Sequence, residues 1–195
     1  MTKDKRTKTL RLQNVNNRVL AAAITATDIW SGIEAARENT IRGKKMRIVR
    51  GTIDHVNQWA RLRAALWPDG SVEQHREDIV ETFLQGAVKT VAFLGEGEES
   101  EIIAFAEGSL RSDYVNGCKT SPVVFLEGIY VLPSHRQKGV ARLLCHAIGI
   151  WGRSRGCSEF ASDAPLENEV SRNFHAALGF AETQRVVFFR KDIEH

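Results

Sequence analysis

The feature that most constrains the fold is a strand, a short turn and a helix that follow one another in the second half of the chain. A long apolar run from Val123 to Leu132 predicts a β-strand, which Glu127 and Gly128 interrupt. Pro133 ends this strand, and residues 140–153 have the apolar spacing of a helix. A strand that leads directly into a helix indicates a fold in which helices pack against a sheet.

The rest of the chain from residue 46 onward alternates between the same two kinds of element. Further strands are expected at residues 46–50, 90–94, 101–110, 158–162 and 185–190, and further helices at residues 54–67, 72–84 and 167–178. Pro68-Asp69-Gly70 and Asn116-Gly117 are turn signals between these elements. The order β-α-α-β-β-β-α-β-α-β predicts one domain of the α/β (α+β) class, with a central sheet flanked by helices.

Length and composition agree with a single globular domain that is not embedded in a membrane. The chain has 195 residues, of which 43% are hydrophobic and 26% charged. No apolar run approaches the roughly 20 residues that span a bilayer. The apolar run Val19–Ala26 is a poor match for a secretory signal, because its polar start is long. The three cysteines form no close pair, so we expect no disulfides and a cytoplasmic location.

The charge is distributed unevenly along the chain. Residues 1–45 contain ten Lys/Arg and four Asp/Glu, whereas the remainder contains 17 basic and 20 acidic residues. We therefore expect a basic N-terminal extension, dispensable for folding, and a mildly acidic domain at residues 46–195. An acidic domain favours a cationic substrate. The extension lacks the interleaved aromatic residues of a nucleic-acid-binding segment, and no nucleic-acid partner is expected.

The turn before the helix at residues 140–153 has the composition of a phosphate-binding site. Arg136, Gly139 and Ala141 stand at R-x-x-G-x-A spacing. The first N–H groups of a helix lack intrahelical partners and lie at the positive end of its dipole. Small residues let the backbone approach a pyrophosphate, and Lys138 and Arg142 add positive charge. The same pattern also fits a capped, solvent-exposed turn, so the motif alone leaves both interpretations open.

The turn and the order of the elements around it resemble the GNAT superfamily of acetyltransferases, over about residues 46–195. The resemblance implies the GNAT fold, a mixed and mostly antiparallel sheet, with acetyl-CoA as co-substrate and no metal. The pyrophosphate of coenzyme A would lie on the backbone of Gln137, Lys138, Gly139, Val140, Ala141 and Arg142. Its pantetheine arm would pair with the strand edge at Ile129, Tyr130 and Val131. Asn168 would also contact coenzyme A, although an Asn near a helix start is often a cap.

Several longer strings narrow the resemblance. Leu66-Trp67-Pro68, the stretches at residues 113–118 and 121–129, Ala161-Ser162-Asp163 and His175-x-Ala177-Leu178-Gly179-Phe180 are similar to aminoglycoside 6'-N-acetyltransferases of the chromosomal type found in enteric bacteria. This likeness implies acetyl transfer to the 6'-amino group of aminoglycoside antibiotics, and therefore antibiotic resistance. It also implies a homodimer, for which the apolar run Val186-Val187-Phe188-Phe189 offers a pairing strand.

Carboxylates are needed to attract a protonated amine and to remove its proton before it attacks a thioester. Glu127 attracts attention because an unpaired charge in an apolar strand is costly. The resemblance implies that Trp67, Tyr114, Glu127 and Asp163 contact the aminoglycoside. Asp163 is the expected proton acceptor, and Glu127 is the competing candidate. A backbone N–H near Tyr130 is expected to stabilise the developing oxyanion.

Two positions depart from the family pattern. His175 stands where many GNAT enzymes carry a tyrosine that protonates the thiolate, so it could be catalytic or structural. Gln184 stands at a substrate-contacting position where the nearer relatives often carry glutamate, which leaves the range of aminoglycosides open. Acetylation of another amine, such as a polyamine or a protein, is the alternative enzymatic function. A non-enzymatic module that binds coenzyme A is the remaining alternative.

Overall fold

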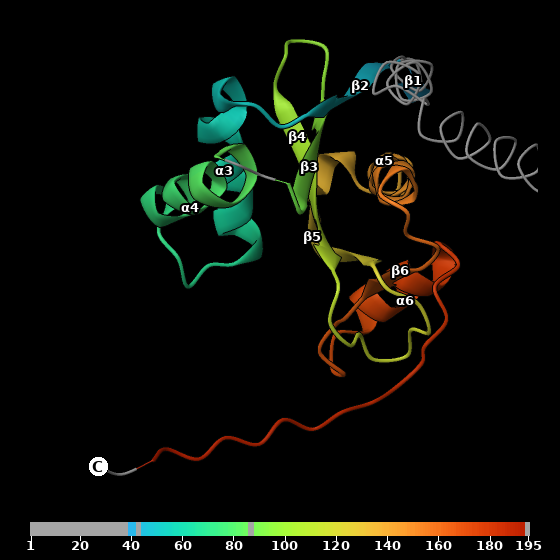
Figure 1. The fold of residues 1–195 in the computed structure, drawn as a ribbon. Coiled ribbons are helices and arrows are strands. Elements are labelled where there is room, and N and C mark those ends of the chain that lie inside the picture. The colour runs from blue at the N-terminus through green and yellow to red at the C-terminus, as the bar shows by residue number, and fades with distance from the viewer. Residues whose placement is uncertain (1–38, 42–43, 86–87, 194–195) are drawn as a thin grey trace, which may run out of the picture. The chain divides into compact units, whose positions relative to one another are not determined.

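The centre of the fold is a sheet of six strands that follow one another in space as they do along the chain. The computed structural model describes residues 39–41, 44–85 and 88–193. The strands are β1 (Asn39–Ile41), β2 (Lys44–Arg50), β3 (Thr90–Glu96), β4 (Ile102–Arg111), β5 (Val123–Val131) and β6 (Phe160–Ser162). All neighbouring pairs are antiparallel except β5 and β6, which are parallel (Figure 1). The sheet is therefore mixed and mostly antiparallel, as predicted.

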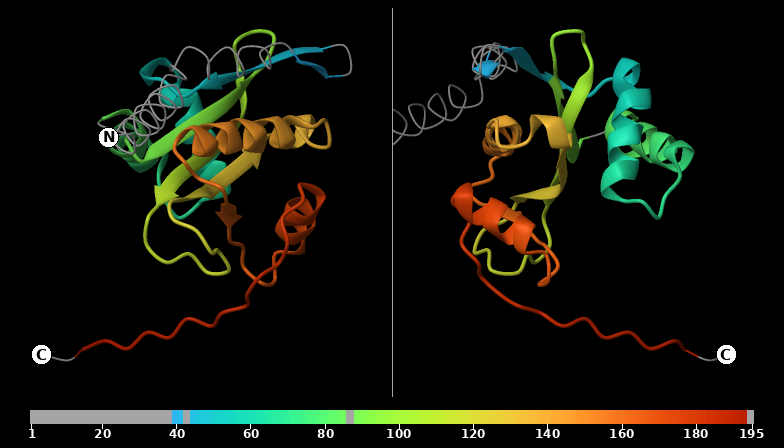
Figure 2. Two further views of the ribbon diagram at one scale, coloured as in Figure 1. Left: turned by 45° about the vertical axis from the view of Figure 1, so that its right-hand side comes forward. Right: turned by 180° about the vertical axis from the view of Figure 1, so that it is seen from behind.

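Helices cover both faces of this sheet. On one face lie α3 (Val56–Leu66), α4 (Val72–Ile79) and a π-helical turn, η2 (Val80–Leu84). On the other face lie α5 (Val140–Ser154) and α6 (Glu169–Ala177), as both views in Figure 2 show. Two 3₁₀ turns are also present. The first, η1 (Ile53–His55), precedes α3, and the second, η3 (Pro133–His135), precedes the turn at residues 136–142, called the basic turn below. Among the described helices, none is both long and apolar enough to cross a bilayer.

Local sequence explains where the helices before β3 begin and end. The side chain of Ser71 accepts a hydrogen bond from the backbone N–H of Gln74, whose own side chain returns to the N–H of Ser71, so a capping box starts α4. Helix α3 ends at Leu66, and Trp67 caps it immediately before Pro68, which cannot extend a helix. The position of Trp67 is thus set by the end of a helix rather than by a loose loop.

Two layers of apolar side chains hold the helices to the sheet. On the α3 side, Trp59 and Phe105 are fully buried in a cluster that also contains Ile79 and Leu94. On the α5 side, Gly152 lies so close to Val124 that a Cβ on the glycine would be 2.6 Å from the valine side chain. This close approach fixes α5 against the strand that leads into the basic turn.

A β-bulge and a splayed strand pair shape the sheet where β5 passes its midpoint. Glu107 of β4 pairs with Gly128, but Gly108 pairs with Leu126, so Glu127 is an extra residue in β5. On the other edge of β5, pairing with β6 covers only Val124 to Leu126. From Glu127 to Val131 the edge of β5 that faces β6 therefore has no strand partner among the residues that the structure describes.

Most of the predicted elements are confirmed, and three differ. The expected helix at residues 72–84 changes to a π-helical turn after Ile79, and β1 was not anticipated. The strand expected at residues 185–190 is wrong: this segment is extended but pairs with no strand among the described residues, and runs away from the sheet (Figure 1). Its apolar side chains Val187, Phe188 and Phe189 are 77%, 89% and 93% exposed. Of the basic extension at residues 1–45, only residues 39–41, 44 and 45 lie within the described part, and the need for it stays a prediction.

Candidate active site

The basic turn has a backbone geometry suited to an anion. Gln137 has a φ of 57° and Gly139 a φ of 81°, so two nearby residues adopt left-handed conformations. Alternation of this kind turns successive N–H groups toward one concave side, which forms an anion-binding nest. Gly139 is the N-cap of α5, where no side chain caps the helix. The N–H groups of Val140, Ala141 and Arg142 consequently have no acceptor within the helix.

The three basic side chains of this turn are held by backbone carbonyl groups. Arg136 donates to the carbonyl of Val131 over 3.0 Å, and Lys138 donates to that of Ser134 over 2.6 Å. Arg142 donates to the carbonyl of Ala177 at the end of α6. Their charges are thereby held close to the turn. The turn can therefore hold a pyrophosphate through its main chain, with Arg136 fixing the end of β5 rather than reaching outward.

The free edge of β5 begins next to this turn. Ile129, Tyr130 and Val131 pair with β4 on one edge only. Because alternate main-chain groups of a strand point to its two edges, the unpaired edge offers N–H and C=O groups to an extended ligand. The predicted cofactor-binding residues of β5 and of the turn are thus brought together at one end of the sheet.

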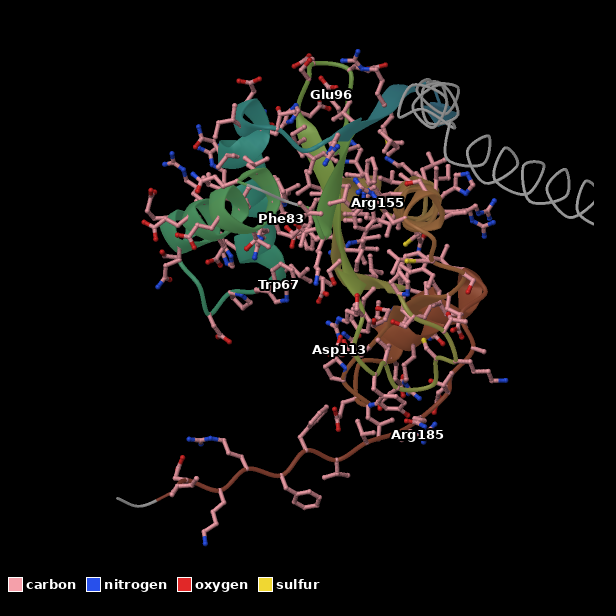
Figure 3. The ribbon with its side chains drawn as sticks, viewed as in Figure 1. Trp67, Phe83, Glu96, Asp113, Arg155 and Arg185 are labelled. Carbon is pink, nitrogen blue, oxygen red and sulfur yellow. The ribbon has the colours of Figure 1, made fainter. Side chains whose placement is uncertain are left out.

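A pocket of about 490 Å³ opens on the α3 face of the same sheet. Its lining combines Trp67 and Phe83 with three carboxylates, one arginine and three hydroxyl residues: Asp78, Glu107, Glu127, Arg63, Thr82, Thr90 and Ser109. Figure 3 shows Trp67 and Phe83 beside the sheet on this face. Trp67 and Glu127, both predicted to bind substrate, therefore belong to one pocket rich in carboxylates.

The bulge sets the direction of Glu127. Its carboxylate accepts hydrogen bonds from the hydroxyl of Ser109 and from Arg111, whose Nη2 lies 2.9 Å from Oε2. The guanidinium of Arg111 also stacks on the ring of Phe125, 3.3 Å from its centroid. A third of the Glu127 side chain stays exposed. Since its oxygens already accept several hydrogen bonds, Glu127 is better suited to binding a cation than to removing a proton.

Trp67 is held in place from four directions. Its ring lies against Gly128, where a Cβ would come within 2.5 Å of Cζ2 of the indole. The guanidinium of Arg63 lies 5.1 Å from the ring centroid, and the ring of Phe105 lies 6.0 Å away. His75 hydrogen-bonds to the backbone carbonyl of Trp67 through Nε2, over 3.0 Å. The indole can therefore act as a rigid wall for a sugar ring.

Asp163 lies just past the last paired residues of β5 and β6, where these two strands separate. It comes directly after β6, whose last residue, Ser162, is paired with Leu126. Asp163 and Glu127 therefore each follow the last paired residue of neighbouring parallel strands and lie at the same end of the gap between them. Asp163 is exposed and, within the described residues, takes part in no ion pair or hydrogen bond. Its carboxylate is free to accept a proton, directly or through water.

The loop between β4 and β5 carries Tyr114, which is 76% exposed and does not line the pocket. Glu159 anchors this loop by accepting hydrogen bonds from the N–H groups of Lys119 and Thr120. The side chain of Thr183 lies against Gly117, where a Cβ would overlap with it. Gln184 follows Thr183 in the chain and therefore lies close to the loop that carries Tyr114. The structure does not bring Tyr114 or Gln184 to the wall formed by Trp67.

Asn168 and His175 make structural contacts, and Cys145 is buried. Asn168 is the N-cap of α6 and accepts from the N–H of Ser171 over 2.9 Å. Nδ1 of His175 donates to the backbone carbonyl of Ser171 over 2.7 Å. This hydrogen bond supports a structural role for His175. Burial raises the pKa of Cys145 to about 12, which makes this thiol an unsuitable nucleophile. The described residues contain no group of three or more metal-ligating side chains.

Sequence reasoning missed three charged residues that line the pocket and a fourth that pairs with Glu127. Glu107 and Asp78 line it, Arg63 pairs with both, and Arg111 pairs with Glu127. Glu107 was detectable, because it interrupts the apolar strand at residues 101–110 in the same way that Glu127 interrupts the next strand. Arg63 gave no such signal, since an arginine on an amphipathic helix is ordinarily solvent-exposed.

Comparisons with known proteins agree with this geometry. Residues 56–180 match the family described as "Acetyltransferase (GNAT) family". The chain is 48% identical over 140 residues to "Aminoglycoside N(6')-acetyltransferase type 1" of Serratia marcescens, covering 72% of this chain and 94% of that protein. It is 42% identical over 148 residues to the protein of the same name from Acinetobacter baumannii, covering 76% and 99%.

Solved structures give the same result. The aminoglycoside N-acetyltransferase AAC(6')-Iy in complex with CoA superposes with a TM-score of 0.73 at 46% identity, covering 78% of this chain and 98% of that chain. A second structure of AAC(6')-Iy contains the bisubstrate analogue CoA-S-monomethyl-acetylneamine and gives a TM-score of 0.68 at 45% identity, covering 76% and 99%.

Proposed function

The chain belongs to the GNAT acetyltransferase family and, within it, to the aminoglycoside 6'-N-acetyltransferases of type 1, and from this premise we propose how its residues transfer an acetyl group from acetyl-CoA to the 6'-amino group of an aminoglycoside. The observation that carries the proposal is that a surface suited to the cofactor and a pocket suited to the substrate lie next to each other at Glu127. The free edge of β5 and the basic turn suit coenzyme A, and a carboxylate-lined pocket on the other face suits a polycation. Such an enzyme confers resistance to the antibiotic it acetylates.

The cofactor side is formed by main-chain groups. The N–H groups from Gln137 to Arg142 hold the pyrophosphate, and the edge from Ile129 to Val131 pairs with the pantetheine arm. Acetyl-CoA, when bound, supplies a thioester whose carbonyl carbon accepts the amine. A backbone N–H of the free edge near Tyr130 then stabilises the negative charge on the oxygen. The left-handed φ of Gly139 supports this assignment, because the nest would not form with an ordinary helical start.

The acceptor side orients the amine and removes its proton. Trp67 provides a flat wall, and Glu127 attracts an ammonium group of the aminoglycoside. Asp163 takes the proton from the 6'-ammonium, through a water if the distance requires one, so that the neutral amine can attack. The coenzyme A thiolate is a tolerable leaving group, so no acid is required from His175.

The function is tested by following free thiol released from acetyl-CoA. Kanamycin and tobramycin serve as aminoglycoside acceptors, and spermidine serves as a polyamine control. We expect turnover with the two aminoglycosides and mass spectrometry to place the acetyl group on the 6'-nitrogen. Absence of turnover with both aminoglycosides at millimolar concentration, or faster turnover with spermidine, would contradict the proposal.

We further propose that the enzyme is a cytoplasmic homodimer. The support is the exposed apolar run Val186–Phe189, which is extended and has no strand partner within the described residues. Exposed strands of this composition pair readily with another chain. Light scattering is expected to give twice the mass of one chain, and replacing Val187 and Phe189 by Ser is expected to give the monomer mass. A wild-type protein that is monomeric at micromolar concentration would exclude this arrangement.

A further inference from the structure

Glu107 is a buried carboxylate at the floor of the acceptor pocket. It lies on β4, only 2% of it is exposed, and it lines the pocket together with Trp67 and Glu127. Nε1 of Trp59 donates to its Oε1 over 2.8 Å, and Nη1 of Arg63 donates to the same oxygen over 3.2 Å. A carboxylate in this position needs such partners, because an unpaired buried charge is costly.

The ion pair of Glu107 also sets the position of Arg63, which in turn lies against the pocket wall. The guanidinium of Arg63 is 5.1 Å from the ring centroid of Trp67 and 5.9 Å from that of Phe83. It is also 3.8 Å from Asp78 of α4. Glu107 therefore acts on the substrate wall through Arg63 and is placed to influence it without touching the substrate.

Charged groups approach Glu107 from α3, α4 and β5, but not from β3. Helix α3 supplies Arg63, α4 supplies Asp78 through Arg63, and β5 supplies Glu127 with Arg111 of β4 behind it. His75 of α4 stands behind Trp67, bonded to its carbonyl. Strand β3 supplies only Ala92 opposite Glu107 and the neutral Thr90 of the pocket lining.

One proton on Glu107 decides whether this pocket carries a net charge. Three carboxylates, Asp78, Glu107 and Glu127, are paired with two guanidinium groups, Arg63 and Arg111. With Glu107 ionised the group is net negative and attracts a polycation. With Glu107 protonated the group is neutral, and the attraction is largely lost.

We propose that Glu107 is a positioning residue that switches the charge of the aminoglycoside pocket: it is partly protonated while the pocket is empty and releases this proton to the solvent when an ammonium group binds beside Glu127. This inference rests on the proposed function, because it takes the substrate to be a polycation in this pocket. The release leaves Glu107 ionised, which strengthens its pairing with Arg63 and so the hold of Arg63 on Trp67.

Both protonation states are accessible near neutral pH. The pKa of Glu107 is raised to about 7, chiefly by burial; Arg63 and the hydrogen bond from Trp59 act against this, and the negative charge of Glu127 adds a smaller increase. An ammonium group beside Glu127 offsets the charge of that carboxylate and so lowers the pKa of Glu107. By linkage, substrate affinity then increases as the pH rises through 7, until the substrate amines lose their own protons.

The test is isothermal titration of kanamycin into the enzyme at pH 7, in two buffers with different ionisation enthalpies. Glu107→Gln keeps an oxygen that can accept from Trp59 and Arg63 but cannot titrate. Because the substrate amines also exchange protons, the quantity of interest is the difference between wild type and variant. Wild type is expected to release about half a proton more per site than Glu107→Gln, as expected for a group half protonated at this pH.

Steady-state kinetics gives a second readout. The ratio of kanamycin KM values, variant to wild type, is expected to rise by up to about tenfold between pH 6 and pH 8, since one unit of pKa change corresponds to a tenfold change in affinity. A merely structural role for Glu107 would shift this ratio by a constant factor, independent of pH. If the variant does not fold, infrared difference spectra of the wild type decide the matter: kanamycin binding is expected to remove a protonated carboxyl band.

Glu96→Gln is the matched control. Glu96 is also a buried glutamate paired with an arginine, Arg47, at 2.9 Å, but it lies at the end of β3 away from Trp67 (Figure 3). Its proton release is expected to equal that of wild type, and the ratio of its kanamycin KM to that of wild type is expected to stay constant between pH 6 and pH 8. Binding with equal proton release in wild type and Glu107→Gln, or no loss of the carboxyl band, overturns this inference alone. Absence of kanamycin binding to wild type overturns the proposed function with it.

Discussion

Replacing Gly128 by Ala tests whether close packing between β5 and Trp67 forms the wall of the acceptor site. A Cβ at this position would lie 2.5 Å from Cζ2 of the indole, whereas ordinary contacts are 3.4–4 Å. The ring must therefore withdraw by about 1 Å. Arg63, Phe105 and the carbonyl bond from His75 restrict that movement.

The expected cost of this overpacking is about 1–3 kcal/mol of unfolding free energy. For a chain of this size it corresponds to a fall in Tm of roughly 2–10 °C. Because Trp67 is displaced in the substrate wall, the kanamycin KM is expected to rise by about tenfold, equivalent to about 1.4 kcal/mol of binding free energy. The KM for acetyl-CoA is expected to change little, since the new methyl group points at Trp67 and not along the free edge of β5.

The assays are thermal denaturation and thiol-release kinetics with each substrate varied in turn. Gly149→Ala is the matched control: its Cβ would meet only Phe160 at an ordinary 3.8 Å. This glycine lies inside α5, so alanine is expected to stabilise the protein by up to about 1 kcal/mol. An unchanged Tm and an unchanged kanamycin KM for Gly128→Ala would refute the assignment of Trp67 as a wall fixed by β5.

Four further predictions concern the cofactor turn, the base, the buried acid and the N-terminus. Gly139→Ala meets no atom within 4 Å but must adopt a φ of 81°, so we expect a loss of about 1–2 kcal/mol of stability and a raised KM for acetyl-CoA only, measured by melting and kinetics. Asp163→Asn is expected to lower kcat at least about 100-fold with little change in Tm. An unaltered kcat would mean that another group accepts the proton. Since the folded pKa of Glu107 lies above its ordinary 4.5, its contribution to stability is full below pH 4.5 and is lost as the pH rises to about 7. In urea unfolding, the free energy of unfolding of wild type should therefore fall by up to about 3 kcal/mol over this pH range, and that of Glu107→Gln should not show this decrease. Deleting residues 1–37, which leaves β1 and β2 whole, is expected to preserve activity, and insoluble protein would show that the extension is required.

The elements that face the core could be predicted because their patterns are local. Residues 56–66 and 140–154 carry apolar side chains at helical spacing, and each of these helices ends near a proline or glycine. The prediction of a strand at residues 185–190 is wrong because strand formation is not a local property. The composition of this segment is that of a strand, but a strand forms only where a partner lies alongside it, and sequence does not reveal whether that partner is present.

The candidate site divides in the same way. The basic turn could be located from its glycine and its position between strand and helix, because anion binding by main-chain groups is a local property. The pairing of Glu107 with Arg63, and of Glu127 with Arg111, joins residues far apart in the chain and depends on the bulge that aligns β4 with β5. Periodicity cannot reveal a bulge of one residue, and so the partners of these carboxylates were missed.

By itself, the sequence determined most of the helices and strands in their order, a glycine-containing basic turn at Gly139 suited to an anion, and the presence of an unusual acid in an apolar strand. Only the tertiary structure decided what surrounds that acid. Glu127 is the extra residue of β5 and lines the pocket, the loss of pairing with β6 after Leu126 leaves the edge proposed to bind coenzyme A, and α3 carries Arg63 to the buried Glu107. Hydrogen bonds within a helix or turn depend on neighbouring residues, whereas the charge of a pocket depends on side chains that only folding brings together.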